Sequence, residues 1–262
     1  VASRDFELAE LKLLVDAIEC SRFITEKKSR ELIRKLESLA SRSEARELQR
    51  QVYVSDRLKN IDEKIYYNID ALHRAISKGV QIRFLYFNWA LDFNRPDKIY
   101  REFRHNSEFY CVSPWALTWD NENYYLIAYD ASAPEGSRIR NYRVDKMEKI
   151  QLTDKHREGA QHFRDNFSPA AYSRKMFGMF TGHEERVRLR CRKDAINILR
   201  DRFGKELMVQ PDDGAHFFAS VTVALSPQFY AWVVGLNGAV RIVGPQSVCE
   251  AFRKLLLEQL EE

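Results

Sequence analysis

The spacing of hydrophobic residues changes twice along the chain, and the first pattern is helical. Up to Gly79, apolar side chains recur every three or four positions, which places them on one face of a helix. A second helix is expected after Thr25 in the N-cap position, and a third from Asn60. The three stripes are Leu11, Leu14, Val15 and Ile18; Leu32, Ile33, Leu36 and Leu39; and Ile61, Ile65, Ile69, Leu72 and Ile76. The pattern predicts a helical region over residues 1–79, whose narrow apolar stripes need partners.

From residue 80 the period changes to two, which is typical of strands. In "VQIRFLYF" the side chains of Ile82, Phe84 and Tyr86 fall on one face and those of the alternate residues on the other. Further segments of this kind are "KIYREFR", "EFYCVS", "NYYLIAYD", "SRIRNYRV" and "EKIQLT". Short strands with close turns predict a small antiparallel barrel, in which five strands coil around one core, over residues 80–155.

A third pattern follows a helical connector, which is expected over residues 156–182. Within it, Ser168 and Pro169 fit the N-cap and the first position of a helix. Residues 183–262 then read as strands and helices in the order βαββαβ, with one more helix at the end. This order is the split βαβ arrangement of ferredoxin-like domains. The predicted fold class is α+β, with a helical region, a five-stranded barrel and a ferredoxin-like domain.

Composition is that of a folded protein with a mild preference for anionic partners. Hydrophobic residues make up 45% of the 262 residues, charged residues make up 31%, and the net charge is +4. The four cysteines lie far apart and form no CxxC pair, which predicts buried thiols in a reduced, cytoplasmic protein. No apolar run approaches the ~20 residues of a membrane helix, so no membrane association is expected.

Motifs of common enzyme families are missing from the sequence. It contains no GxGxxG, GxxxxGK[ST], HExxH or GxSxG. The "HEER" segment lacks the second His that a zinc-binding helix needs. Most carboxylates stand next to Lys or Arg, as they do on solvated faces. We therefore predict no catalytic activity, no cofactor and no metal.

Tyrosine and arginine are concentrated in "NENYYLIAYDASAPEGSRIRNYRVDKMEKI". If "SRIRNYRV" is a strand, Arg138, Arg140 and Tyr142 project to one face. Two guanidinium groups about 7 Å apart repel each other unless an anion or carboxylates lie between them. The neighbouring strand supplies Tyr125 and Tyr129. Arginines beside aromatic rings suit single-stranded nucleic acid, which offers phosphates to the first and bases to the second.

The same cluster also has a purely structural interpretation. Exposed arginines commonly pair with acidic neighbours, here Asp130, Glu135 or Glu148. Barrel tyrosines commonly pack in the core while their hydroxyl groups reach water. The residue pattern alone leaves both interpretations open.

Residues 80–152 resemble the WYL domain of bacterial transcription regulators, which is named for a Trp-Tyr-Leu triplet. The resemblance lies in "YCVSPWALTWDNENYYLIAYD" and in "IRNYRVDKM". The matching residues are Ser113, Pro114, Trp115 and Leu117; the triplet positions Tyr124, Tyr125 and Leu126; and Arg140, Tyr142, Asp145 and Lys146. Two residues depart from the family pattern, since Tyr124 replaces Trp and Lys146 replaces Arg. A lysine cannot reproduce the bidentate phosphate contact of an arginine.

The resemblance implies an Sm-like barrel and a ferredoxin-like C-terminal extension, in the effector-binding part of a regulator. It also implies a nucleic-acid effector, either single-stranded DNA or a short oligonucleotide. Arg140, Lys146 and either Arg143 or Arg138 would then contact phosphates, while Trp115 and Tyr125 would supply stacking or shape. The candidate ligand-binding residues are Ser113, Trp115, Tyr125, Arg138, Arg140, Arg143 and Lys146.

Partners are implied in the same way. Such regulators carry an N-terminal winged helix-turn-helix, and residues 1–24 have room for one helix, so duplex DNA is expected to bind through a domain missing from this chain. The helix at 25–40 is interpreted as a linker or dimerisation helix, and a homodimer is expected. Two other hypotheses stay open. The first is a protein–protein interaction module with a charged rim, and the second is an enzyme acting on nucleic acid or a nucleotide.

Overall fold

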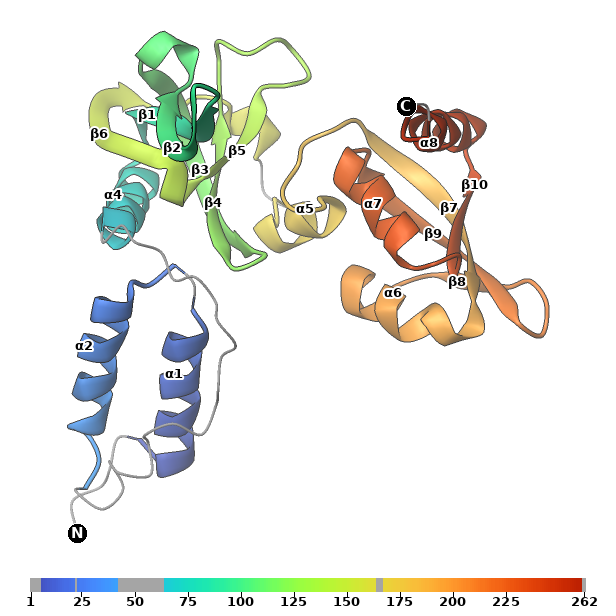
Figure 1. Ribbon diagram of the computed structural model, residues 1–262, viewed down its shortest axis with the longest axis horizontal. Coiled ribbons are helices and arrows are strands. Elements are labelled where there is room, and N and C mark those ends of the chain that lie inside the picture. The colour runs from blue at the N-terminus through green and yellow to red at the C-terminus, as the bar shows by residue number, and fades with distance from the viewer. Residues whose placement is uncertain (1–5, 22, 42–63, 164–166, 261–262) are drawn as a thin grey trace. The chain divides into compact units, whose positions relative to one another are not determined.

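The computed structural model describes residues 6–21, 23–41, 64–163 and 167–260. The chain divides into two compact units, Val1–Ala160 and Gln161–Glu262. The first unit joins helices to a curled antiparallel sheet, and the second packs helices on a separate sheet (Figure 1). The predicted α+β fold class is confirmed.

The N-terminal helices in the described residues are α1 (Leu8–Cys20), α2 (Glu26–Glu37) and α4 (Lys64–Lys78). Thr25 caps α2 as expected, since its hydroxyl accepts a hydrogen bond from the backbone N–H of Lys28 at 3.2 Å. The predicted helix start at Asn60 lies outside the described residues. The first stripe is only partly buried, because Leu11 is 2% exposed but Leu14 is 39% exposed.

The first sheet has six strands, which are β1 (Val80–Asp92), β2 (Arg95–Phe103), β3 (Tyr110–Asp120), β4 (Asn123–Tyr129), β5 (Ile139–Arg143) and β6 (Met147–His156). Their order is β2-β1-β3-β4-β5, with β6 on β1. Among the described strands no pairing joins β5 to β6, so the sheet is curled and open, and the one-turn 3₁₀ helix η2 (Val144–Lys146) connects these two strands.

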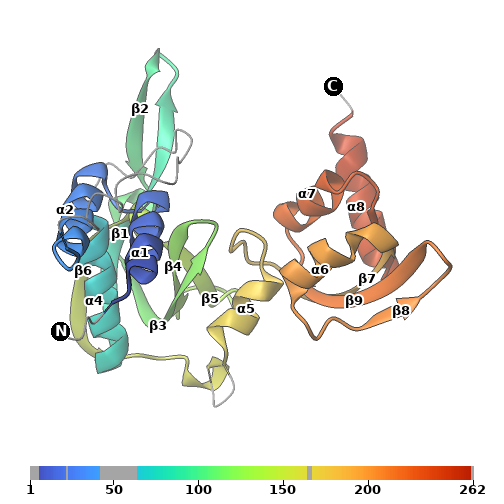
Figure 2. The ribbon, with the colours of Figure 1, turned by 90° about the horizontal axis from the view of Figure 1, so that it is seen from below.

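The sixth strand, β2, lies outside the predicted five-stranded barrel. Strand β1 runs on to Asp92 instead of stopping near Phe87, and its outer half pairs only with β2. Its inner half pairs with β3 and β6. Five strands therefore enclose the core, as predicted, while β2 and the end of β1 form a hairpin that extends from the sheet (Figure 2). Alternating Trp89 and Leu91 prolong the strand pattern beyond the core.

Helix α4 covers the core of the curled sheet. Ile65, Leu72 and Ala75 are buried against Ile82 and Phe84 of β1. Phe23, between α1 and α2, lies edge-on to Trp119 and Tyr124, with ring centroids 5.0 and 5.1 Å away. Tyr124 of the triplet thus packs against the helical region. Leu126 of the triplet is fully buried.

The second unit contains α5 (Pro169–Lys175), β7 (Glu184–Arg192), α6 (Ile196–Phe203), β8 (Val209–Pro211), β9 (His216–Ala224), α7 (Pro227–Gly235), β10 (Val240–Gly244) and α8 (Gln246–Glu258). Its antiparallel sheet has the order β10-β7-β9-β8. A βαββαβ chain with the fourth strand beside the first and the third beside the second is ferredoxin-like, as predicted.

Local signals place the helix ends of this unit. Ser168 and Ser226 cap α5 and α7, and a proline follows each of them at the first helical position. Gly204 ends α6 with a φ of 91°, a conformation that glycine adopts without strain. The periodicity of residues 183–262 therefore predicts the elements well.

The cysteines are free, but the expectation that they are buried holds only for Cys191. Cys111 is exposed, and Cys20 and Cys249 are partly buried. Burial raises the pKa of the Cys191 thiol to about 12, so this group stays protonated. Within the described residues, no helix is long and apolar enough to cross a membrane.

Candidate anion-binding site

The candidate residues on strands β4 and β5 divide between the two faces of the curled sheet. Ala128 pairs with Arg140, whereas Tyr125 pairs with Arg143. Because Ala128 faces the core, Arg140 lies on the inner face of the sheet. Arg143 is three positions away, so it lies with Tyr125 on the outer face. The predicted cluster is therefore two separate arrangements.

Arg140 lies on the inner face beside the buried carboxylate of Asp130. Its Nε is 3.5 Å from Asp130 Oδ2, and no hydrogen bond satisfies this buried nitrogen. Asp130 is occupied by other donors, since Tyr142 donates to Oδ2 at 3.3 Å and Ser132 donates to Oδ1 through its hydroxyl at 2.6 Å. The Arg140 side chain is 43% exposed. A cation that is only partly neutralised thus stands at the edge of the core.

Two tyrosines beside this site keep their protons at neutral pH. Burial, followed by the charge of Asp130, raises the pKa of Tyr142. Burial likewise raises the pKa of Tyr86 to about 12. Both phenols are therefore neutral, and Tyr142 remains a hydrogen-bond donor to the carboxylate of Asp130.

An aromatic cluster leads from Arg140 toward the loop between β2 and β3. The ring of Tyr142 lies 5.5 Å from that of Tyr86 and 5.7 Å from that of Tyr110. His105 lies 5.2 Å from Tyr110. His105 and the two residues after it all have positive φ. Such backbone strain in residues other than glycine is common at functional sites.

Arg143 is fully engaged on the outer face. It donates two hydrogen bonds to Asp145, at 3.0 and 2.7 Å, and a third to Asn123 at 2.8 Å. Burial alone would lower the pKa of Arg143, but the hydrogen bonds and the charge of Asp145 raise it overall. Its backbone N–H donates to the hydroxyl of Tyr86 at 3.2 Å. Arg143 therefore holds β5 and the η2 turn together.

Lys146 ends the η2 turn in a surplus of positive charge. Partial burial lowers its pKa first, and the nearby charges of Arg143 and Arg104 lower it further, against the opposite effect of Asp145. Two cations and one acid thus surround the ammonium group. An anion bound here would relieve this repulsion.

The remaining candidates hold the segment that follows β6. The hydroxyl of Ser113, which is 2% exposed, accepts the backbone N–H of Glu158 at 2.8 Å. The indole N–H of Trp115 donates to the carbonyl of the same residue at 2.9 Å. The guanidinium of Arg157 covers the Trp115 ring at 3.8 Å. Ser113 and Trp115 are thus tied to the end of the sheet.

Comparisons with known proteins agree with this architecture. The model of the WYL domain matches residues 67–152, and the model of the WCX domain matches residues 183–260. The chain therefore contains a WYL domain and a WCX domain. The WYL domain corresponds to the curled sheet with most of α4, and the WCX domain corresponds to the ferredoxin-like unit.

Solved structures provide two further comparisons for this WYL-domain protein. Proteasome accessory factor B/C (PafBC) of Arthrobacter aurescens is 19% identical, with a TM-score of 0.34, over 98% of this chain and 37% of that chain. A CRISPR Cas-related protein is 12% identical, with a TM-score of 0.41, over 97% of this chain and 70% of that chain. The WYL-domain protein thus spans little more than a third of PafBC. A comparison with curated proteins found no match.

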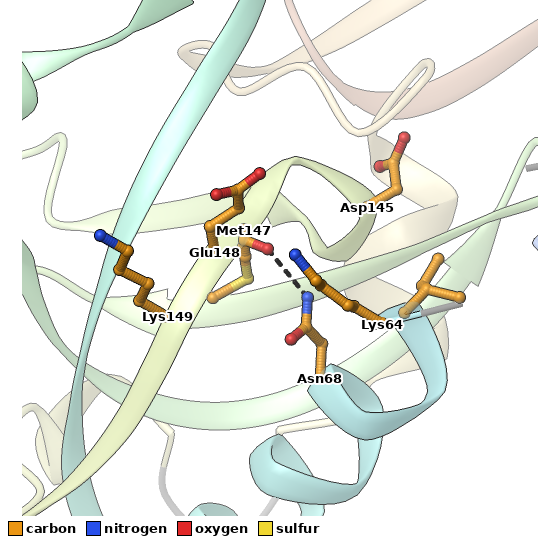
Figure 3. Close-up of a pocket in the computed structure, with 7 residues that line it drawn as sticks. Lys64, Asn68, Asp145, Met147, Glu148 and Lys149 are labelled. Carbon is orange, nitrogen blue, oxygen red and sulfur yellow. Dashed lines mark hydrogen bonds between the residues drawn. The ribbon is translucent and has the colours of Figure 1, made fainter. Parts of the chain in front are cut away.

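A pocket of about 290 Å³ lies beneath the η2 turn of the WYL domain. It is lined by Lys64, Ile65, Asn68, Asp145, Met147, Glu148 and Lys149. Figure 3 shows Asn68 of α4 reaching the backbone of Met147. Its side-chain amide donates to the Met147 carbonyl at 2.8 Å and to the Val144 carbonyl at 3.4 Å. Helix α4 therefore holds the turn that carries Asp145 and Lys146.

Several residues of the WYL site were not among the candidates. Arg104 and His105 come from the β2–β3 loop and Tyr110 is the first residue of β3, and they meet β5 only because the sheet is curled. The sequence offers Asp130 only as an ion-pair partner for an arginine, and it does pair with Arg140. Glu148 pairs instead with Arg101. A buried Asp at the end of an apolar strand was the one signal that could have singled out Asp130.

Proposed function

We propose that this chain is the effector-sensing part of a transcriptional regulator, whose WYL domain binds single-stranded nucleic acid or a short oligonucleotide. The observation that carries the proposal is the partly exposed Arg140 guanidinium, whose buried Nε has no hydrogen-bond partner. A buried donor without a partner costs free energy, and a phosphate oxygen would give this guanidinium a full partner. The family of the chain supports the regulatory role.

The proposed phosphate ligands are Arg140 and Lys146, with Arg138 beside them. Arg138 is only weakly held, by 3.3 Å and 3.4 Å contacts to Tyr129 and to the Ala133 carbonyl. The aromatic cluster that contains Tyr142 and Tyr110 offers ring surface for a base. A ligand with both charge and rings fits this arrangement better than a simple inorganic anion does.

Four candidates take a positioning role in this proposal. Tyr125 is only 7% exposed and Ser113 only 2%, so neither offers a surface to a ligand. Arg143 is occupied by Asp145 and Asn123. Trp115 is covered by Arg157. These side chains stabilise the sheet that positions the proposed phosphate ligands.

In this proposal, ligand binding changes the arrangement of the helical region through α4. A phosphate at Lys146 pulls on the η2 turn, and Asn68 transmits this to α4 through its hydrogen bonds to Val144 and Met147. A ligand can shift the helical region only if it binds one of its arrangements more tightly. In a dimer, such a shift would reposition domains that bind duplex DNA.

The test is binding of a fluorescently labelled ten-nucleotide single strand to the full chain, followed by anisotropy over a salt series. Arg140→Ala combined with Lys146→Ala should weaken binding at least tenfold and reduce the slope of log affinity against log salt by about 1.4. The matched control, Lys98→Ala with Lys155→Ala, removes the same charge from exposed positions of the same unit. Equal behaviour of the two double variants would refute the site.

A protein–protein role is the second candidate, because the β1–β2 hairpin has an uncovered apolar face. Trp89, Leu91 and Ile99 lie on it, at 57%, 43% and 66% exposure, and Phe93 at the tip is 89% exposed. A hairpin alone is marginally stable in water, so such a face favours a partner. We propose a second copy as that partner, since two such faces together bury about 1,000 Å², the lower bound for a specific interface.

Sedimentation velocity over a concentration series tests this pairing. The wild-type chain should sediment as a dimer at micromolar concentration, and Phe93→Ser with Ile99→Thr should make it a monomer. Leu256→Ser with Leu260→Thr removes comparable exposed apolar surface from the C-terminal end and should leave the dimer intact. A wild-type monomer at all concentrations would exclude the pairing.

A further inference from the structure

Strand β7 carries a row of arginines on the open face of the WCX sheet. Val187, Leu189 and Cys191 are buried in the core of this unit. The alternate positions are Arg186, Arg188, Arg190 and Arg192. Figure 2 shows α6, α7 and α8 on one side of the sheet, and the buried residues face these helices. The arginines therefore project from the side without helices.

Neighbouring strands extend the row into a basic and aromatic surface. Arg188 pairs with Ser220 of β9, and Arg190 pairs with Phe218. On the other side, Arg241 of β10 pairs with Arg190. Residues that pair across strands point to the same face, so five guanidinium groups and one phenyl ring share this surface.

Acidic neighbours neutralise only part of this charge. Arg190 pairs with Asp212 at 2.6 Å and with Asp213 at 2.9 Å. Arg192 pairs with Asp194 at 2.8 Å. In the part of the chain that the structure describes, Arg186, Arg188 and Arg241 form no ion pair. A central band of the sheet thus keeps its positive charge.

The ring of Phe218 sits within this band. The guanidinium of Arg188 lies over it, 4.0 Å from the centroid. A planar cation at this distance covers the ring much as a nucleic-acid base would. Arg188 occupies this face of the ring, so a base would stack on Phe218 when Arg188 turns away to a phosphate.

We infer that the open face of the WCX sheet, formed by β7, β9 and β10, is a second binding site for single-stranded nucleic acid. Arg186, Arg188 and Arg241 contact phosphates, and Phe218 stacks with a base. A merely acidic partner would use the charge but would gain nothing from the ring. The site lies on a different unit from Arg140 and Lys146 and does not depend on them.

The experiment uses the full chain with Arg140→Ala and Lys146→Ala already in place, and a labelled fifteen-nucleotide oligo-dT. Adding Arg186→Ala with Arg188→Ala should weaken the residual binding about tenfold or more and lower the salt slope by about 1.4. Adding Phe218→Leu alone should weaken it about fivefold with an unchanged slope, because a stacking contact is lost without any phosphate contact. Arg200→Ala with Arg253→Ala, on helices of the same unit, is the charge-matched control.

Each outcome of this binding experiment either supports or overturns the second site. Loss of residual binding in the Arg186/Arg188 and Phe218 variants, with the control unaffected, supports the site even if the Arg140 and Lys146 substitutions prove harmless. Equal residual binding in every variant overturns it and leaves the WYL site untouched. The binding of heparin to Arg186→Ala with Arg188→Ala is measured as well. If Phe218→Leu has no effect and this double variant loses heparin binding together with oligo-dT binding, the face is a general polyanion surface and the inference is wrong. Circular dichroism melting of each variant confirms that it is folded.

Discussion

The side chain of Asn68 on α4 is hydrogen-bonded to the backbone carbonyl of Met147, 79 positions later in the chain, at 2.8 Å. The bond connects a helix of the N-terminal region to the turn that presents Lys146. Because a second carbonyl, that of Val144, also accepts from the same amide, one side chain fixes both ends of the η2 turn. The proposed anion site is therefore positioned by a residue that lies outside it.

Replacing Asn68 with Leu should loosen this connection. The Met147 carbonyl would lose its side-chain partner, which costs about 1–2 kcal/mol of unfolding free energy. Urea unfolding followed by circular dichroism measures this loss, with Asn197→Leu on α6 as a surface control. Oligonucleotide affinity should fall several-fold in Asn68→Leu even under conditions where the protein is fully folded. A stability loss without any change in affinity would remove Asn68 from the binding mechanism.

Asp130→Asn should strengthen anion binding. The carboxylate partly neutralises Arg140, and it competes with an incoming phosphate. An amide of the same size removes the charge while keeping one oxygen as a hydrogen-bond acceptor. We expect several-fold tighter oligonucleotide binding at low salt, together with a stability loss of roughly 1–3 kcal/mol because of the buried network. Weaker binding in the folded variant would show that Asp130 itself contacts the ligand.

Alkaline pH should destabilise the first unit through Tyr86. Burial raises the pKa of Tyr86 from 10.0 to about 12, so the folded state holds this proton more tightly than the unfolded state does. The stabilisation is complete below pH 10 and is lost as pH rises from 10 to 12, by roughly 3 kcal/mol in total. Urea midpoints at pH 9, 10 and 11 measure the trend. The difference between wild type and Tyr86→Phe should shrink over this range, and a constant difference would contradict the assignment.

Gly159 should tolerate no side chain. A Cβ at this position would lie 2.4 Å from Cγ of Tyr129, and its φ of 87° already disfavours other residues. Gly136 has a similar φ of 86° but open space around it, so it separates the two effects. We expect Gly136→Ala to cost about 1 kcal/mol and Gly159→Ala about 2–4 kcal/mol in thermal or chemical unfolding. Equal costs would mean that Tyr129 moves aside freely.

Periodicity predicts most of the fold of this chain because each element has a clear apolar face. The βαββαβ order and the capping residues Ser168 and Ser226 could be identified without the structure. Strand alternation also implies that Arg140 and Arg143 point to opposite faces, in agreement with the register of β4 and β5. What the sequence could not supply was the choice of partners. Asp145 binds Arg143 because the η2 turn folds back beside it.

The site residues in the β2–β3 loop and at the start of β3 were harder to predict from the sequence. Arg104, His105 and Tyr110 are separated from β5 by about 30 positions of sequence, and they approach it only when the sheet curls. Curling depends on twist and on irregular pairing, such as the register shift within β3 and β4 near Trp115. These properties belong to the assembled sheet and leave little trace in local sequence.

The arginine row of β7 also determines which pairing of strands can form during folding. A slip of one residue against β9 would turn Arg186, Arg188, Arg190 and Arg192 toward the helices and expose Val187, Leu189 and Cys191 to water. Burying even one unpaired guanidinium costs several kcal/mol, so a misaligned sheet is excluded by a wide margin. The charges that would attract an anion to this face thus also favour a single register of β7 against β9.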